Sequence, residues 1–512
     1  MDDLLNEYIQ YQESHETASS AQCDAAANDE QRDYDNYVER TKEYYYKMSC
    51  GDFFRALWFT WSSCYIGISE YAKYRVGWKS RNNAIIDVSK RLAAKNMMYV
   101  KVFQAFATNR NIVSHELNEF FSEYTDNVKY TSDEYDIKEL KELEARSCEC
   151  WPYQQLRIEN EYTPIKSGLM SLIFKGYIGG APIVVKYLRK NISKNFNASM
   201  NNLVVFAKIT KYFPYLRTFN VENLILQNIV CMNDQVCFRK ELENIKTYYN
   251  SWKDYEYVKI PMPYSDYTEK VNPDVVVMEY IDGIKITEIA PEDNDAFGKV
   301  LASFNGKAAF CTSIFHGDLH PGNILFIKSS APPTHKIGIL DFGIIGHLSR
   351  TDQEILFNAT KFMYQRKFNK IIDLIMSCEL SECMNAASGI SSSLATTTVP
   401  ARNSDTYNTL RQELTRVLVA YTTPEIKFFG VSEIYEINYI LNKYGLMFKR
   451  SLYRLFITVA IMDSIGTRLG GEMSYIQHMT DIVVEMFNIK MDEPDTDEEE
   501  EDEDEDDDEE SD

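Results

Sequence analysis

The chain reads Phe315-His-Gly-Asp-Leu-His-Pro-Gly-Asn-Ile-Leu-Phe326 in the stretch that decides its fold, and Ile337-Gly-Ile-Leu-Asp-Phe-Gly343 shortly after it. In the first stretch Asp318 is followed five positions later by Asn323, and an apolar strand comes next. In the second stretch an apolar strand ends in Asp341. Carboxylate and amide oxygens of this kind bind hard cations, and a carboxylate can also orient a nucleophile. The two stretches therefore predict one polar site.

The spacing of these residues is that of a protein-kinase catalytic loop followed by Asp-Phe-Gly. In that arrangement Asp318 orients or deprotonates the attacking hydroxyl, Asn323 reaches a metal bound to the phosphates, and Asp341 binds the magnesium that bridges them. Asp-Phe-Gly alone is common by chance, but its position after His-Gly-Asp-x-x-x-x-Asn makes the pattern specific. We expect an α+β, bilobal protein-kinase-like fold with a β-rich N-lobe and a helical C-lobe, and ATP and Mg²⁺ as cofactors.

The alternation of apolar residues predicts two strands, Leu169 to Ile178 and Pro182 to Leu188, joined at Gly179-Gly180. The second strand carries Lys186, which matches the strand lysine that neutralises the α- and β-phosphates of ATP. Most strand lysines are simply solvated, so this assignment depends on the two downstream stretches.

A lysine in this role needs a glutamate from a helix, and the helical stretch Phe238 to Ile245 offers Glu241 and Glu243. We prefer Glu241, although either could be an ordinary exposed helix acid. The apolar strand that follows would lead into the hinge that hydrogen-bonds adenine through its backbone, which makes three residues candidates by position: Met278, Glu279 and Tyr280.

Composition and periodicity divide the chain into five parts. They are a polar, mobile arm, a helical N-terminal extension, a kinase-like N-lobe with a helical insertion, a helical C-lobe and an acidic disordered tail, with bounds 1–50, 51–150, 151–283, 284–490 and 491–512. The Ser/Thr-rich stretch 387–406 is expected to be a loop.

The net charge of −23 comes mainly from the tail, because residues 492–512 hold 18 acids and the rest of the chain carries only −5. Nothing in this balance predicts a nucleic-acid partner. The tail itself is expected to be a solvated segment; binding of a basic partner is the alternative.

The N-terminus is acidic, which fits neither a secretory signal nor a mitochondrial presequence. The longest uncharged, apolar-leaning run, Ala56 to Ser69, has 14 residues and is shorter than the roughly 20 that cross a bilayer. The cysteines are scattered without zinc spacing, and His316 and His320 lie in a Pro-Gly turn, where they are expected to stabilise the loop. We expect an intracellular, cytoplasmic protein with no transmembrane segment, for which peripheral membrane contact stays open.

The motifs resemble those of the UbiB family of atypical kinases, which pair a His-Gly-Asp-Leu-His-Pro-Gly-Asn loop with Asp-Phe-Gly-x-x-Gly, here ending at Gly346. The segment from Val277 to Lys285 is similar to the family's hinge, and the resemblance runs from about residue 85 to residue 475. Aminoglycoside and choline kinases share the first loop, but not this continuation. The resemblance implies ATPase activity and a link to isoprenoid-quinone biosynthesis at membranes, and the composition is compatible with family members encoded by large DNA viruses.

The family also carries a Lys-x-Gly-Gln helix over the active site, and its counterpart here keeps Lys101 and Gln104 as candidate regulatory residues, with Phe103 in place of the glycine. A bulky ring at that position could displace the helix. The family's Ala-rich nucleotide loop corresponds to Lys166-Ser-Gly-Leu-Met-Ser171, which has only Gly168 as a flexible candidate for nucleotide binding.

Ordinary protein kinases have an arginine where this chain has Gly317, and an Ala-Pro-Glu that this chain lacks before the helical pattern Thr351 to Phe368. This favours a lipid or small-molecule acceptor, or ATP hydrolysis, over an extended peptide. The sequence predicts a magnesium-dependent, ATP-binding phosphotransferase or ATPase with an unknown acceptor. Two alternatives stay open: a Ser/Thr protein kinase with unconventional substrate docking, and a nucleotide-binding pseudokinase or scaffold.

Overall fold

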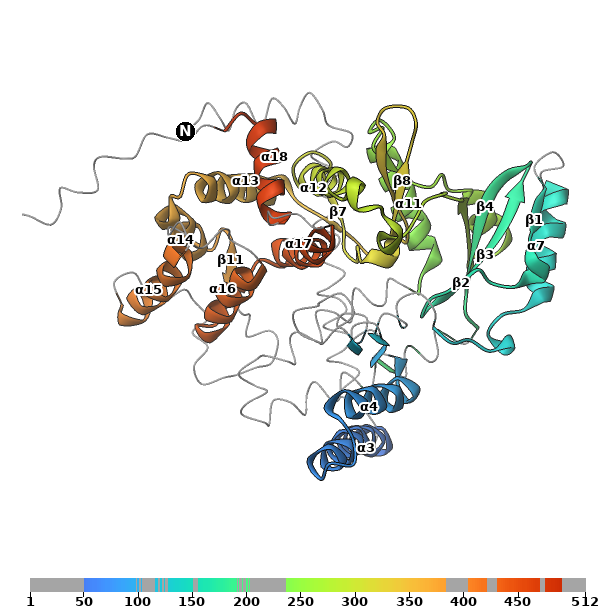
Figure 1. Ribbon diagram of the computed structural model, residues 1–512, viewed down its shortest axis with the longest axis horizontal. Coiled ribbons are helices and arrows are strands. Elements are labelled where there is room, and N and C mark those ends of the chain that lie inside the picture. Colours follow the sequence, from blue (N-terminus) through green and yellow to red (C-terminus); the bar gives the residue numbers. More distant parts are fainter. Residues whose placement is uncertain are drawn as a thin grey trace, which may run out of the picture.

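The computed structural model describes residues 50–97, 99–100, 128–150, 155–190, 236–383, 404–420, 431–469 and 475–489, with single residues between 103 and 124 and between 192 and 202. Among these residues a strand-rich lobe lies at one side of the molecule and a helical lobe at the other (Figure 1). Several predicted features lie outside the described residues: the arm 1–49, Lys101, Gln104, most of the Ser/Thr-rich stretch and the acidic tail.

The core of the N-lobe is the predicted hairpin. Strand β3 (Ser171–Ile178) pairs antiparallel with β4 (Ala181–Leu188), and the register runs from Ser171 opposite Leu188 to Ile178 opposite Ala181. The two turn residues have φ angles of 56° at Gly179 and 88° at Gly180. Glycine adopts this left-handed conformation without strain, so the Gly-Gly pair allows a tight two-residue turn. The predicted hairpin is confirmed.

A five-stranded antiparallel sheet is built around this hairpin, in the order β1 (Leu156–Ile158), β3, β4 and β6 (Val275–Glu279), with β2 (Lys166–Ser167) also paired to β3. Successive side chains of a strand point to opposite faces. Val185 and Tyr187 pack with helix α7 (Ile137–Cys150) on one face, whereas Val184 packs with helix α11 (Phe238–Trp252) on the other. Lys186 shares the second face, which is the face toward the C-lobe.

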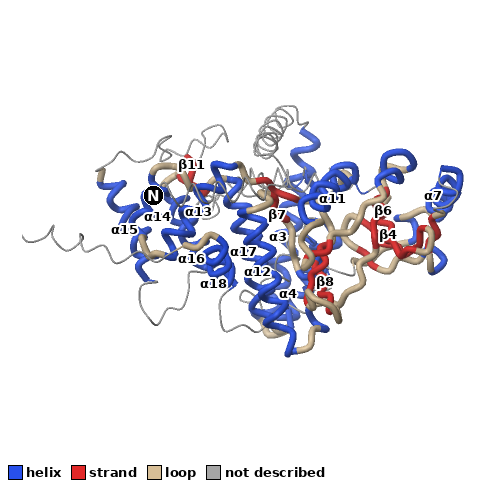
Figure 2. The backbone as a smooth tube through the Cα atoms, turned by 90° about the horizontal axis from the view of Figure 1, so that it is seen from above, coloured by secondary structure: helices blue, strands red, loops and turns tan. Residues whose placement is uncertain are grey.

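The C-lobe is mainly helical, and its helices lie at the opposite end of the molecule from the sheet (Figure 2). Its helices are α12 (Asn294–Phe310), α13 (Arg350–Tyr364), α14 (Phe368–Met376), α15 (Asp405–Val419), α16 (Val431–Lys443), α17 (Arg450–Arg468) and α18 (Tyr475–Met486). One continuous hydrophobic cluster joins them to the inner face of the N-lobe. The two lobes therefore share a core.

Short strands in the C-lobe hold the two motif loops in place. Strand β8 (Ile324–Lys328) pairs with β9 (His335–Ile339), and β9 pairs with β5 (Val258–Lys259). Strand β7 (Ile314–His316) pairs with β10 (Ile345–His347), and β11 (Ser381–Cys383) pairs with β12 (Leu446–Phe448). The first motif loop lies between β7 and β8, and the second lies between β9 and β10, so each loop is held by paired strands at both ends.

The chain passes from the second motif into a helix over a very short distance. Only β10 separates Gly343 from α13, which begins at Arg350 and is capped by the hydroxyl of Ser349 accepting a hydrogen bond from the Asp352 N–H. The helix agrees with the predicted helical pattern, and no long loop intervenes between the motif and α13.

Two further helices, α3 (Cys50–Arg75) and α4 (Arg81–Lys95), form a helical hairpin at the lower edge of Figure 1. Gly77 takes a φ angle of 79° in their short connection, and the hydroxyl of Ser80 accepts from the N–H of Asn83 to cap α4. Among the residues that the structure describes, no helix combines the length and apolarity needed to cross a bilayer.

Gly346 of β10 offers a direct test of how tightly this region is packed, because a Cβ there would collide with the ring of Phe315. We expect Gly346→Ala to lower the free energy of unfolding by about 1–3 kcal/mol. Gly298 lies inside α12 with open space around it, so Gly298→Ala should raise stability by up to about 1 kcal/mol. Equilibrium urea unfolding measures the free energy of unfolding of the two variants. If both substitutions changed it equally, Gly346 would not be as closely packed against Phe315 as the structure shows.

Candidate active site

The three acid and amide residues of the two motifs meet at one place. The side-chain Nδ2 of Asn323 donates to the carbonyl oxygen of Asp318 at 2.9 Å, which closes the loop between β7 and β8. The carbonyl oxygen of Asn323 accepts from the Leu340 N–H at 2.8 Å, which places the residue before Asp341 against that loop. The side chains of Asp318, Asn323 and Asp341 line the same cavity.

Lys186 enters this site from the sheet and binds two carboxylates. Its Nζ lies 2.5 Å from Oε1 of Glu241 and 3.1 Å from Oδ1 of Asp341. Burial alone would lower the pKa of Lys186, but the negative charges of Asp341 and Glu241 outweigh burial and raise it, so the ammonium stays charged. Burial raises the pKa of Glu241, an effect that Lys186 opposes. The ion pairs link the sheet, α11 and the second motif.

Helix α11 brings Glu241, and not Glu243, to the lysine. Glu241 is buried beside Lys186, whereas Glu243 is exposed. One turn further along the same face, Nδ2 of Asn244 donates to the carbonyl oxygen of Phe342 at 2.7 Å. Sequence reasoning did not single out Asn244, although its i, i+3 spacing from Glu241 places it on the same side of a helix. The helix thus contacts both the lysine and the Asp-Phe-Gly backbone.

The imidazole ring of His316 links the backbones of the two motifs. Its Nε2 donates to the carbonyl oxygen of Asp341 at 2.5 Å, and its Nδ1 accepts from the Asp318 N–H at 3.2 Å. This pattern needs a neutral ring with its proton on Nε2. Burial lowers the pKa of His316, which favours the same neutral form. Asp341 has a φ of +60°, an unfavourable conformation for a non-glycine residue, so the histidine helps to hold a strained backbone.

Helix α17 supports His316 from the C-lobe side. The hydroxyl of Thr458 donates to the carbonyl oxygen of His316 at 3.1 Å, and Arg454 donates to the carbonyl oxygen of Ile345 at 3.0 Å. Burial lowers the pKa of Arg454 to about 10, which still leaves it charged at neutral pH. Neither residue was predicted, because nothing in the local pattern of a distant helix shows which loop it will touch.

Gly317 is required by close packing. A Cβ at this position would lie 2.6 Å from Cγ2 of Ile344, and the Gly317 N–H donates to the carbonyl oxygen of Ile344 at 2.9 Å. The Cβ of the arginine that ordinary protein kinases carry here would collide with the side chain of Ile344, just before β10. The departure noted in the sequence therefore has a steric cause.

The cavity has a volume of about 150 Å³ and is lined from both lobes. Gly168 and Met278 line it, as the sequence led us to expect, together with Lys166, whose Nζ donates to the carbonyl oxygen of Gly322 at 3.0 Å. Glu279 and Tyr280 are not among the lining residues. The carboxylate of Glu279 lies 2.7 Å from Nζ of Lys259, and the Tyr280 N–H donates to the carbonyl oxygen of Pro182 at 3.1 Å.

Arg189 fixes the loop that carries Gly168. Its guanidinium is buried and donates to the carbonyl oxygen of Gly168 and to the hydroxyl of Ser167, both at 2.6 Å, and it also pairs with Glu134. The loop is therefore held by a planar cation that satisfies several acceptors at once. Sequence reasoning missed Arg189, which lies one residue after β4 and resembles any solvated arginine.

The donor set of the cavity fits Mg²⁺ that arrives with a nucleotide. The Asp341 side chain is 46% exposed and faces the cavity with Asn323, so one carboxylate and one amide are available. Mg²⁺ is commonly held by one or two carboxylates together with phosphate oxygens, rather than by a cage made of protein alone. In the described part of the chain, no three His, Cys, Asp or Glu side chains are placed to hold a metal by themselves.

The buried neutral state of His316 predicts acid sensitivity. Its pKa is lowered in the folded protein, so the unfolded chain binds more protons as pH falls below the ordinary value of 6.5 and the folded state loses stability there. We expect His316→Asn to be less stable than wild type at neutral pH, but to lose less of its stability on acidification from about pH 7 to about pH 5.

Thermal unfolding of both proteins across this pH range measures the difference. Burial also lowers the pKa of His347, so part of the pH dependence should survive in the variant. Identical pH dependence in wild type and His316→Asn would show that His316 is not held neutral by the fold.

Residues 131–375 match the ABC1 atypical kinase-like domain. The chain is 24% identical over 286 residues to "Protein ACTIVITY OF BC1 COMPLEX KINASE 8, chloroplastic" of Arabidopsis thaliana, covering 54% of this chain and 36% of that protein. It is 25% identical over 293 residues to "Probable protein kinase UbiB" of Marinobacter nauticus, covering 56% of this chain and 52% of that protein. The chain thus spans about half, or less, of the length of these curated relatives.

Two solved structures are similar in parts. The complex of Rv3197 with erythromycin from Mycobacterium tuberculosis has a TM-score of 0.44 at 15% identity and covers 79% of this chain and 98% of that one. The Rio2 kinase–ADP/Mg²⁺–phosphoaspartate complex from Chaetomium thermophilum has a TM-score of 0.27 at 12% identity and covers 65% and 86% of the two chains.

Proposed function

Since residues 131–375 form an ABC1 atypical kinase-like domain and the chain belongs with the UbiB atypical kinases, we propose that it is a magnesium-dependent, ATP-binding phosphotransferase or ATPase. One observation carries the proposal: Lys186 is buried and bound to both Glu241 and Asp341 on the wall of a cavity that Asp318 and Asn323 also line. Each of these groups has a role in phosphoryl transfer, and all of them reach the same space.

Lys186 would bind the α- and β-phosphates of ATP, and Glu241 would hold the ammonium in position. In the structure Lys186 also neutralises Asp341, so phosphate oxygens would take over as partners of the lysine when Asp341 turns to a metal. Asp341 and Asn323 would hold the Mg²⁺, which when bound neutralises charge on the β- and γ-phosphates.

Asp318 would orient the attacking hydroxyl or water and accept its proton. The new bond joins the attacking oxygen to the γ-phosphorus, and the bond between that phosphorus and the β,γ-bridging oxygen breaks, with ADP as the leaving group. His316 does not take part directly; it sets the distance between the Asp318 and Asp341 backbones. Pre-set geometry of this kind is the main contribution of a protein to phosphoryl transfer.

The acceptor would be water, a small molecule or a lipid. A single short strand separates Gly343 from α13, so no extended segment is available there as a peptide platform. Gly317 also removes the arginine that docks a phosphorylated activation loop in ordinary protein kinases. A Ser/Thr protein kinase with another docking mode and a pseudokinase are the alternatives, and the convergence of four polar groups on one cavity favours turnover over simple binding.

The proposal is tested by MgATP binding and phosphate release with the full chain. We expect Asp341→Asn to bind MgATP weakly and to reduce phosphate release by about 10²-fold or more, because it removes the carboxylate that would hold the Mg²⁺. Lys186→Ala should act similarly, but it also leaves Glu241 buried without its cation, so its own melting temperature serves as the baseline for nucleotide-induced shifts.

Glu241 and Glu243 provide a matched pair on one helix. Glu241→Gln should reduce turnover by at least about tenfold, because Lys186 loses its main anchor, whereas the same change at exposed Glu243 should leave turnover near wild type. Equal effects at the two positions would contradict the assignment of Glu241.

Wild-type binding without phosphate release would support the pseudokinase alternative. Transfer of labelled phosphate to protein hydroxyls, stable to hydroxylamine and to a chase, would support the protein-kinase alternative. Absence of MgATP binding in the wild type would refute the proposed function.

A further inference from the structure

Helix α3 carries a continuous stripe of exposed aromatic and apolar side chains. Trp58, Trp61, Tyr65 and Ile68 are between 55% and 67% exposed and recur at intervals of three and four residues, which places them on one side of the helix. The three aromatic rings stack in order along the helix, with centroids 5.0 Å apart for Trp58 and Trp61 and 5.7 Å apart for Trp61 and Tyr65. We call these four residues the aromatic stripe.

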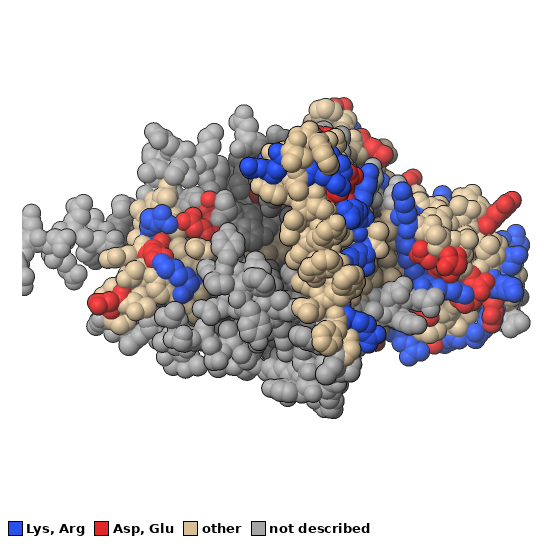
Figure 3. Space-filling model, turned by 90° about the horizontal axis from the view of Figure 1, so that it is seen from below, with Lys and Arg blue, Asp and Glu red and all other residues tan. Residues whose placement is uncertain are grey.

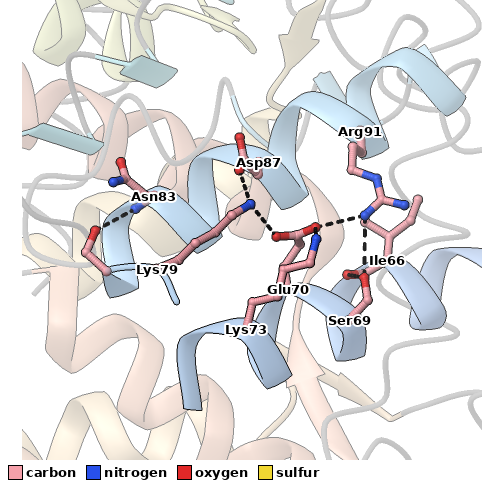
Figure 4. A network of polar contacts seen from close by, with 9 residues as sticks. Ile66, Ser69, Glu70, Lys73, Lys79, Asn83, Asp87 and Arg91 are labelled. Carbon is pink, nitrogen blue, oxygen red and sulfur yellow. Dashed lines mark hydrogen bonds and ion pairs between the residues drawn. The ribbon is translucent and has the colours of Figure 1, made fainter. Parts of the chain in front are cut away.

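The stripe is not needed to hold the helical hairpin together. The opposite side of α3 packs toward α4 and buries Phe59, Ile66 and the charged residue Glu70. The carboxylate of Glu70 forms three ion pairs (Figure 4). Its partners are Nζ of Lys73 on the same helix at 2.6 Å, Nζ of Lys79 in the connection at 2.7 Å and Nη1 of Arg91 on α4 at 2.9 Å. The hydrogen bonds from Lys73 and Lys79 lower the pKa of Glu70 to about 2, so this buried anchor is ionised at neutral pH.

The hairpin is basic in an otherwise acidic chain. Residues 50–97 contain eight Lys and Arg against three Asp and Glu, whereas the chain as a whole carries a net charge of −23. Lys and Arg border one side of a band of uncharged side chains on the face of the molecule where α3 and α4 lie (Figure 3). Exposed aromatic side chains on a hairpin with an excess of Lys and Arg are complementary to a surface that is both apolar and negatively charged.

We propose that the α3–α4 hairpin is a docking surface for an anionic lipid bilayer, with α3 lying in the plane of the interface and the aromatic stripe inserted among the lipid headgroups. Trp and Tyr combine an apolar ring with a polar edge and concentrate at this depth of a membrane. Basic side chains beside an exposed aromatic and apolar stripe add attraction to anionic lipids.

Several features favour a membrane over a second protein as the occupant. The stripe lies along a single helix, and its largest members are tryptophan and tyrosine rather than the aliphatic residues of a helix-packing seam. Exposure continues past the end of α3 to Trp78, which is 79% exposed and is followed by Lys79 and Arg81. This hairpin lies outside the segment that matches the kinase-like domain, so the inference is independent of the proposed activity.

Tryptophan fluorescence provides a direct readout, because Trp58, Trp61 and Trp78 are three of the five tryptophans in the chain and Trp252 is fully buried. We expect the emission of the full chain to shift to shorter wavelength when vesicles of phosphatidylcholine and phosphatidylglycerol in equal parts are added. Lipids brominated near the headgroup should quench it. Phosphatidylcholine alone, or high salt, should weaken both effects.

The variant Trp58→Ser/Trp61→Ser/Ile68→Ser should reduce vesicle binding in flotation by about tenfold or more, because it removes the inserted side chains. The matched control is Ile137→Ser/Val419→Ser, which changes exposed apolar residues on α7 and α15 and should float like wild type. Unchanged melting temperature and MgATP binding would show that the stripe variant keeps its fold.

The quenching measurement needs only the wild type, so misfolding of the stripe variant would not leave the proposal untested. Absence of an emission shift and of quenching with anionic vesicles would overturn it. A stripe that serves as an interface between two copies would also overturn it; in that case the stripe substitutions would lower the mass in light scattering, without any vesicle binding by the wild type.

Discussion

The site depends on one buried cation held between two carboxylates. Moving an ammonium group out of water costs several kcal/mol, and a protein can keep it charged only by placing anions beside it. Lys186 satisfies this requirement with Glu241 from α11 and Asp341 from the loop after β9, so one side chain fixes three elements that are far apart in the sequence. The two carboxylates differ in burial. Glu241 is enclosed, whereas the Asp341 side chain is 46% exposed and faces the cavity.

The remaining contacts of the site make this arrangement rigid. Asn244 holds the Phe342 carbonyl, His316 holds the Asp341 carbonyl, and the hydroxyl of Thr458 holds the backbone of His316 in turn. Hydrogen bonds in a low-dielectric interior are costly to leave unmade, so each one restricts the next. Helix α11 therefore fixes the second motif from the N-lobe side, and α17 fixes it from the C-lobe side through His316. A site for phosphoryl transfer needs this kind of fixed electrostatic frame.

The sequence was sufficient for the parts of this frame that are local. The Gly-Gly turn, the alternating strand that carries Lys186 and the five-residue spacing from Asp318 to Asn323 all follow from short-range rules, and the structure contains them. The sequence offered two helix glutamates and we preferred Glu241, but the fold supplies the reason, because it buries Glu241 beside Lys186 and leaves Glu243 exposed. Arg189, Arg454 and Lys166 could not be predicted, because their importance comes from carbonyl groups that approach them from other parts of the chain. The aromatic stripe was visible only as an uncharged run, and its exposure became apparent with the helical hairpin.

A structure of the full chain with Mg²⁺ and a non-hydrolysable ATP analogue tests the central claim most directly. We predict a triphosphate beside Lys186, with oxygens of Asp341 and Asn323 on the metal and Glu241 still bound to the lysine. A nucleotide bound elsewhere, or a metal that contacts neither Asp341 nor Asn323, would contradict it.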